Sequence, residues 1–378
     1  MKLYTRIIIL YEVENSMNNR KRKMQIEGNN CLLFVFFVVA MPLSIGIVCE
    51  GQTTQNSGAS ESAIELQRGT EIVFAGVEEA KQRLTMKDDF INSLSPFERS
   101  ARLKTDQNVS ETEFLEHVAN QVRSWTIDEK NRIRVIIESV SNQLKPFELK
   151  LPQKILLIKT TGQEEGGAAY SRPNAIVIPQ NMLIQQNADL QKLLIHELFH
   201  IFTANNPKLK EALYGVINFK KCDDIELPVT LREIKITNPD GIKNDHYIEV
   251  QYENSVIQVV PIIYSSVPKY NVTKGGEFFR YLRINLLVIE KEGNIWRYKR
   301  DNTGEPVLLE LRDVPDYFNK IGFNTNYTLH PEEILADNFV LIVQRIQPVK
   351  SKWVIEDMQK VLQHDPGKIP EKNNTNNI

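Results

Sequence analysis

The stretch from Asp189 to Asn205 reads DLQKLLIHELFHIFTAN and decides the fold. Its leucine, isoleucine and phenylalanine side chains recur every three or four positions, which is the spacing of a helix with an apolar face. Asn187 or Asp189 is a suitable N-cap, and Pro207 provides a stop. The sequence therefore predicts a helix here, and this helix carries the residues on which the functional prediction rests.

The pattern His196-Glu197-Leu198-Phe199-His200 lies inside the predicted helix. A spacing of four residues places both imidazoles on one helical face, one turn apart, where both can bind the same Zn²⁺ ion. Glu197 stands beside them and is the predicted general base, which takes a proton from the metal-bound water. The alternative is a helix that holds two histidines for packing alone.

A catalytic zinc site needs a third protein ligand, and Glu333 is the predicted one. Asp337 follows four residues later, so one carboxylate can bind the metal while the other accepts the N–H of a ligand histidine. Glu332 is the rival ligand, but Ala336 stands four residues after it. Acids at a helix N-terminus also stabilise the macrodipole, although that explanation does not cover Asp337 in mid-helix.

Together these residues resemble the gluzincin metallopeptidases, the thermolysin-like group with an HExxH helix and a later ExxxD helix. The resemblance implies that His196, His200 and Glu333 bind zinc, that Glu197 is the general base, and that Asp337 supports a ligand histidine. It covers about 165–205 and 325–345. Two departures concern the substrate: a long β-rich insertion separates the ligand helices, and the chain shows no exopeptidase motif.

The segment AAYSRPNAIVI, residues 168–178, is similar to the edge strand that precedes the HExxH helix in such enzymes, against which a peptide lies extended. Tyr170, Arg172 and Asn174 are the predicted substrate-binding residues. Tyr327 and His330 are the candidate donors to the oxyanion that develops during hydrolysis. The competing interpretations are a packed aromatic ring for Tyr327, a helix cap for His330 and a solvated strand end for Arg172.

Composition excludes several classes of protein. The 378 residues are 42% hydrophobic and 25% charged, which is ordinary for a globular chain. Forty-six basic and 48 acidic side chains leave a formal charge of −2, so no overall field favours nucleic acid. The three cysteines, Cys31, Cys49 and Cys222, are too few for a disulfide framework or a thiolate zinc site.

The N-terminal residues 1–50 are predicted to be a signal peptide or a signal anchor. Arg20, Lys21 and Arg22 form a basic region, and the run from Cys31 to Cys49 carries no charge. Cleavage is expected after Gly46, with Gly51 as the second choice; the length of the apolar run also suits an uncleaved anchor. Either case places the rest of the chain outside the cytoplasm, with membrane contact only through the anchor.

The expected fold class is α+β. A zincin-like catalytic domain is predicted at 146–350, with a β-rich insertion at about 220–315, behind a helical N-terminal region at 63–145. A linker is predicted at 51–62 and a disordered tail at 364–378, because both stretches are polar and lack an apolar period.

Individual elements of the domain are also predicted. Lys154–Lys159 and Asn174–Ile178 read as strands, and alternating segments such as His246–Tyr252 indicate that the insertion is largely antiparallel. A second helix is expected from Pro331 to about Gln344, since proline is tolerated in the first turn of a helix.

The predicted function is zinc-dependent hydrolysis of peptide bonds in a peptide or protein substrate outside the cytoplasm. Two alternatives stay open. The chain could hydrolyse a small amide or ester in a closed pocket, or it could be a non-catalytic extracytoplasmic binding module in which zinc staples two helices. A purely structural zinc site has no use for Glu197, which disfavours the module. The sequence leaves the oligomeric state open.

Overall fold

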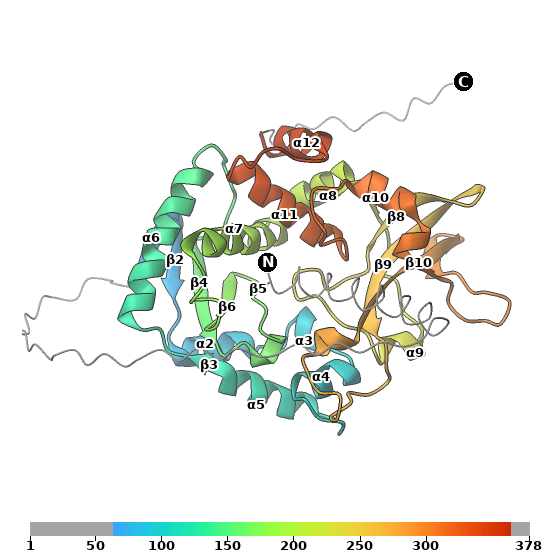
Figure 1. The fold of residues 1–378 in the computed structure, drawn as a ribbon, viewed down its shortest axis with the longest axis horizontal. Helices are drawn as coiled ribbons and strands as arrows, with labels where there is room; N and C mark the ends of the chain where they lie inside the picture. The colour runs from blue at the N-terminus through green and yellow to red at the C-terminus, as the bar shows by residue number, and fades with distance from the viewer. Residues whose placement is uncertain (1–62, 364–378) are drawn as a thin grey trace, which may run out of the picture.

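The computed structural model describes residues 63–363, which combine eleven α-helices with two six-stranded sheets (Figure 1). This mixed composition is consistent with the expected α+β class. The predicted signal segment, the linker and the tail lie outside the described residues. Within 63–363 no helix combines the length and apolar character needed to cross a membrane.

The first sheet is mixed, with its central strands parallel. Its order is β1-β2-β4-β6-β5, in which β2, β4 and β6 run parallel and the edge strand β5 is antiparallel to β6. The short β3 (Val122–Arg123) also pairs with β4. The other strands are β1 (Ala63–Gln67), β2 (Thr70–Phe74), β4 (Lys154–Thr160), β5 (Tyr170–Arg172) and β6 (Ala175–Pro179). The predicted strands at 154–159 and 174–178 are thus confirmed as β4 and β6.

The N-terminal region is less purely helical than expected, because β1, β2 and β3 belong to it. Ile64 and Leu66, then Ile72 and Phe74, are buried at a period of two, which is the signal of a strand. Gly69 lies between the two strands with φ +82°, a conformation that favours glycine. Twelve residues of strand period therefore precede the helical spacing that fills the rest of the region.

Helices cover both faces of the first sheet (Figure 1). On one face lie α6 (Ile127–Leu144) and α7 (Asn187–Ala204), and on the other lie α2 (Val77–Leu84), α3 (Asp89–Ser93) and α5 (Glu111–Gln121). The helix predicted over 189–205 is confirmed as α7. Because β4 and β6 are covered on both faces, their residues are almost all buried.

The second sheet is antiparallel throughout, as expected for the insertion, and has the order β11-β10-β9-β8-β7 with β12 paired to β10. Its strands are β7 (Phe219–Lys221), β8 (His246–Tyr252), β9 (Ser255–Ser265), β10 (Leu282–Glu292), β11 (Ile295–Tyr298) and β12 (Leu308–Glu310). The helices that accompany it are α4 (Pro96–Arg102), α8 (Pro207–Val216), α9 (Val229–Arg232) and α10 (Pro315–Ile321).

The helix α11 (Pro331–Val343) packs against α7, and α12 (Lys352–Gln363) packs against α11. The predicted helix from Pro331 to about Gln344 is confirmed. One apolar core runs from the first sheet through α7 and α11 to the second sheet. This continuous core fixes α7 and α11 side by side at the junction of the two sheets, where the candidate site lies.

Candidate metal centre

His196 and His200 lie one turn apart on α7, and their ring centroids are 4.7 Å apart. The flanking Leu194, Ile195 and Leu198 are buried in the core, so the helix cannot rotate without exposing them. The His200 side chain is 2% exposed and that of His196 is 15% exposed. The packing of α7 therefore presents both imidazoles toward α11.

Glu333 on α11 completes a three-residue cluster. Its Oε2 atom lies 3.0 Å from His196 Nε2 and 3.7 Å from His200 Nε2. One ligand atom from each of these residues lies within 4.8 Å of the other two, which is close enough to share a metal ion. The structure thus brings together the three predicted ligands from helices more than 130 residues apart in the sequence.

Each histidine of the cluster is held at its other ring nitrogen by a carboxylate. Asp337 Oδ1 lies 3.1 Å from His196 Nδ1, as predicted, and Glu332 Oε1 lies 3.4 Å from His200 Nδ1. An ionised carboxylate only accepts hydrogen bonds, so each Nδ1 is the donor. Both Nε2 atoms are then presented to the centre of the cluster, and this is how ligand histidines are oriented in metal sites.

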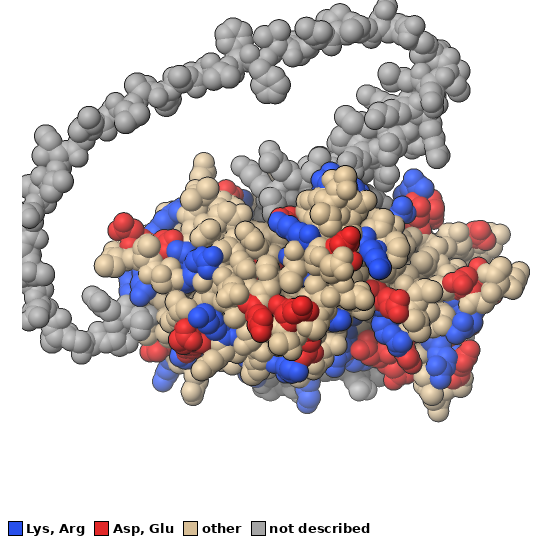
Figure 2. Space-filling view, turned by 90° about the horizontal axis from the view of Figure 1, so that it is seen from below, with Lys and Arg blue, Asp and Glu red and all other residues tan. Residues whose placement is uncertain are grey.

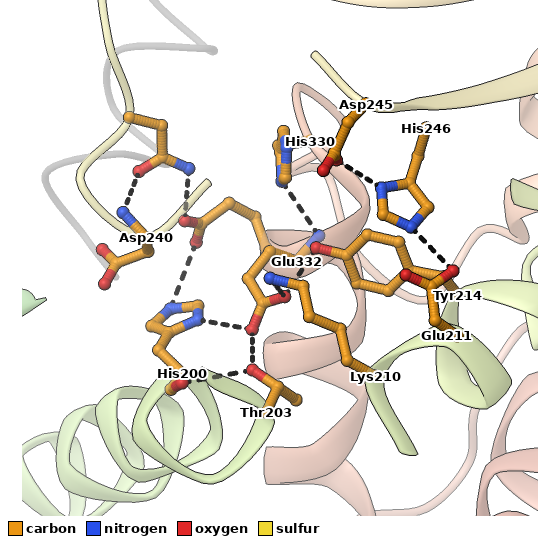
Figure 3. A network of polar contacts seen from close by, with 12 residues as sticks. His200, Thr203, Lys210, Glu211, Tyr214, Asp240, Asp245, His246, His330 and Glu332 are labelled. Atoms are coloured by element: carbon orange, nitrogen blue, oxygen red, sulfur yellow. Dashed lines mark hydrogen bonds and ion pairs between the residues drawn. The ribbon is translucent and has the colours of Figure 1, made fainter. Parts of the chain in front are cut away.

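Glu332 is therefore not the unpartnered rival that the sequence indicated. It lies at the centre of a buried network (Figure 3). Its carboxylate accepts hydrogen bonds from Tyr214 Oη at 2.6 Å and from the Thr203 hydroxyl. It also forms an ion pair with Lys210 at 3.1 Å. Burial raises the pKa of Glu332, but Lys210 and His200 outweigh it, so the net pKa lies well below the usual range. Glu332 stays a carboxylate that fixes His200.

The electrostatics of the cluster suit a cation. Burial lowers the pKa of His200, but Asp240 and Glu333 outweigh it and raise the pKa to about 9. Burial also lowers the pKa of His196, while hydrogen bonds to Asp337 and Glu333 raise it well above its ordinary value. The surrounding carboxylates therefore favour positive charge at this point, whether a proton or a metal ion supplies it.

Two buried polar atoms at the centre have no hydrogen-bond partner within the described residues: His200 Nε2 and Glu197 Oε2. An unpartnered buried polar atom costs about 1–3 kcal/mol, so such atoms call for a partner. Two imidazole nitrogens and a carboxylate oxygen form a donor set that binds divalent metals. The residues present therefore fit a metal ion, with His200 Nε2 as one of its ligands.

Glu197 points into the cavity beside the cluster and is only 3% exposed. Burial, followed by the nearby Asp240 carboxylate, raises the pKa of Glu197 to about 8. A carboxylate with a pKa near neutrality can both accept and return a proton. This position agrees with the predicted general base.

Two residues of the insertion, Asn238 and Asp240, belong to the site and were not predicted. Asn238 Nδ2 donates to Glu333 Oε1 at 2.7 Å, and Asp240 groups with Glu197 and His200 in a second set of close ligand atoms. The sequence Asn238-Pro239-Asp240-Gly241 is typical of a turn, but nothing in it indicates which helix the turn approaches.

The turn packs against His330. A Cβ atom on Gly241 would come within 2.4 Å of the His330 ring, so only glycine permits this approach. His330 Nδ1 accepts a hydrogen bond from the Glu332 backbone N–H at 3.1 Å and caps α11. Burial lowers the pKa of His330 to about 4. His330 is absent from the lining of the cavity, so the prediction that it is an oxyanion donor is corrected to a structural cap.

Tyr327 does line the cavity, and its ring stacks on His196 with centroids 6.3 Å apart. The three predicted substrate-binding residues are placed elsewhere. Tyr170 is 3% exposed and packs in the core below the sheet, and Arg172 forms a buried ion pair with Asp88. Asn174 lies in the turn between β5 and β6 with φ +60°. None of these three lines the cavity, so their positions do not support the substrate-binding role that the resemblance implied.

The edge strand β5 is also covered. The Ser171 backbone N–H donates to Asp240 Oδ1 at 3.0 Å, and the residues of β5 are all buried. An extended peptide would need such an edge amide for pairing. The predicted extended substrate along β5 is therefore corrected: the insertion occupies that position.

The cavity beside the cluster has a volume of about 380 Å³. It is lined by His196, Glu197, Asp240, Glu333 and Asp337 at its acidic end, and by side chains from α7, α11 and the segments 323–327 and 348–350 elsewhere. A volume of this size is at the lower end of the range for small-molecule sites.

No protein-family model matches the chain, and neither do any of the curated proteins or solved structures.

Proposed function

We propose that this protein is a zinc-dependent peptidase with a zincin-like catalytic domain, in which His196, His200 and Glu333 bind zinc. The observation that carries the proposal is the cluster itself, with both Nδ1 atoms held by carboxylates and both Nε2 atoms turned toward Glu333. The donor set matches that of catalytic zinc sites with two histidines and a glutamate. The resemblance to gluzincins rests on these same positions.

Zinc bound there would supply Lewis-acid chemistry, because it polarises a carbonyl and lowers the pKa of a coordinated water. The protein supplies the geometry. Asp337 and Glu332 fix the two imidazoles, and Asn238 fixes Glu333 by donating a hydrogen bond to its Oε1 atom. Such supporting contacts are worth about 10–100-fold in affinity or activity.

Glu197 is the proposed general base. Its Oε2 atom has no partner in the described part of the chain and lies at the cavity wall beside the cluster. The carboxylate can accept a proton from the attacking water and return it to the leaving nitrogen. A structural zinc site would gain nothing from a buried, unpartnered carboxylate at this position, so its presence favours the enzyme over a zinc-stapled binding module.

Tyr327 is the remaining candidate for the oxyanion donor. It stacks on a ligand histidine at the cavity wall, close to where the carbonyl oxygen of a substrate would gain charge. His330 caps α11 and is absent from the cavity lining, so we do not assign it to this step.

A second candidate function is hydrolysis of a small amide or ester. The observation that favours it is the covering of β5, which removes the open edge beside which a long peptide would lie. The cavity of about 380 Å³ accommodates a short substrate in either case. The two candidates share the metal and the base and differ only in the bond that is cleaved.

The site of action is proposed to be outside the cytoplasm, on the grounds of the basic region and uncharged run within residues 1–50. A reporter fused after Ile378 should be active only outside the cytoplasm. Reporter activity inside it would contradict export.

The function is tested by metal analysis of the purified protein together with cleavage of a peptide library, with and without a chelator. We expect one zinc per chain and chelator-sensitive cleavage. A panel of N-acyl amides and esters run in parallel identifies the second candidate. A folded protein without stoichiometric zinc would contradict both.

A further inference from the structure

Two lysines, Lys192 and Lys350, line the cavity beside the metal cluster. Lys192 lies on α7 and Lys350 on the segment that follows α11. Neither forms a hydrogen bond or an ion pair with any residue between 63 and 363. A carboxylate offers such ammonium groups a charge-assisted hydrogen bond, which is stronger than a bond to a neutral backbone carbonyl.

The other charged groups of the cavity wall already have partners or a chemical role. Glu333 and Asp337 contact the ligand histidines, Asp240 Oδ1 accepts from Ser171, and Glu197 is the proposed base. The two lysines are the charged groups of the described lining that the cluster does not use. They therefore indicate a further ligand group that the cavity can bind.

The position of Lys192 relative to the cluster follows from its place on α7, which packs antiparallel to α11. Going along the pair away from the metal cluster, Lys192 stands one turn before His196, and Leu341 stands one turn after Asp337. One helical turn is about 5.4 Å, and one residue of extended peptide spans about 3.3–3.6 Å. A scissile carbonyl at the cluster thus leaves room for one or two residues before a terminal carboxylate meets Lys192.

Apolar side chains also line the cavity. They are Met182, Leu193, Phe323, Leu341 and Val349. The Phe323 ring is 48% exposed, so it is accessible to a ligand in the cavity. The wall thus suits an apolar side chain between the cleaved bond and the carboxylate.

We propose that Lys192 and Lys350 bind the free C-terminal carboxylate of a short peptide whose last residue is apolar. This inference rests on the proposed peptidase function and makes the protein a carboxypeptidase. The covered edge strand β5 agrees with it, because removal of a terminal residue needs no long extended substrate. The opposite reading, recognition of a free α-amine by Asp240, makes the protein an aminopeptidase and is separated by the test.

The test uses the zinc-loaded full chain and two matched peptides, N-acetyl-Ala-Ala-Leu and its C-terminal amide. We expect kcat/KM to be about 10–100-fold higher for the free acid, since a hydrogen bond to a charged group typically contributes that much. In Lys192→Met/Lys350→Met the preference should fall to near unity, chiefly through a rise in KM for the free acid. Lys208→Met, an exposed lysine on α8, is the matched control and should keep the preference.

Binding supplies a second readout that does not depend on turnover. Zinc-loaded Glu197→Gln should bind the free acid about 10–100-fold more tightly than the amide, and the double lysine variant in this background should not. If neither peptide is cleaved by the parent protein but this difference in binding is found, carboxylate recognition stands and the peptidase function fails.

Equal cleavage and equal binding of the two peptides would overturn the inference and leave the peptidase function intact. A preference for unacetylated Ala-Ala-Leu that disappears in Asp240→Asn would also overturn it, in favour of the aminopeptidase.

Discussion

The Oε1 atom of Glu332 lies 3.4 Å from Nδ1 of His200, on the side of the imidazole opposite Glu333. The two adjacent glutamates therefore divide two tasks: Glu333 faces Nε2 of the ring, where the proposed metal would bind, and Glu332 fixes the opposite side at Nδ1. The backbone explains this division, because consecutive residues near the start of α11 project about 100° apart around the helix.

Exchange of each glutamate for glutamine should separate these tasks. Glu333→Gln removes a ligand and should abolish stoichiometric zinc binding. Glu332→Gln keeps the ligands but weakens the hold on His200, so zinc affinity should fall by about 10–100-fold. Competition with a chromophoric chelator measures both. Loss of zinc from Glu332→Gln alone, with Glu333→Gln still loaded, would reverse the assignment.

Asn238 should contribute to zinc affinity although it lies far from both ligand helices in the sequence. Its Nδ2 group donates to Glu333 Oε1 at 2.7 Å, so Asn238→Ala should reduce zinc affinity by about tenfold or more. Asn238→Asp places a like charge beside Glu333 and should reduce zinc affinity further than Asn238→Ala does. Asn326→Ala, which changes an exposed amide on the cavity wall, is the control and should leave zinc affinity unchanged in the same titration.

Asp337→Asn should be milder in turnover than a change of the base, because Asp337 orients His196 and does not touch the substrate. We expect a loss of about 10–100-fold in activity or zinc affinity. Zinc affinity should follow the reverse order: Asp337→Asn should bind zinc more weakly than Glu197→Gln does. Steady-state kinetics and chelator titration on the same preparations check both orders.

The buried Arg102 is predicted to be important for stability. It pairs with Glu98 at 3.0 Å and Glu165 at 2.8 Å, and its side chain is fully buried. Arg102→Met would leave two buried carboxylates without their partner, so the free energy of unfolding should fall by about 3–5 kcal/mol. Lys104→Met breaks the exposed pair with Glu277 and should cost less than about 1 kcal/mol. Urea denaturation measures both losses, and equal losses of unfolding free energy in the two variants would contradict this prediction.

The sequence predicted what depends on local spacing. The helix around His196 and His200, the helix that begins at Pro331, and the pairing of Glu333 with Asp337 all follow from residues three or four positions apart. Segments with a period of two likewise predicted β8 and much of the second sheet.

Contacts between distant segments could not be predicted in this way. Asn238 and Asp240 reach the site because the second sheet positions their turn against His330 and β5, and no periodicity reports that. Glu332 appeared to lack a partner because its partners are on α7 and α8. Tyr170 was assigned from the resemblance of its segment to an edge strand, and that resemblance does not show that helices cover the face on which Tyr170 lies.

The most direct test of the central claim is the turnover of zinc-loaded Glu197→Gln. The residue is not a ligand in the proposed cluster, so the variant should bind one zinc per chain and keep its fold. Its kcat should fall by about 10²–10⁴-fold, the usual contribution of a positioned acid–base group. Hydrolysis at the parent rate with zinc fully bound would contradict the proposal that this metal centre is catalytic.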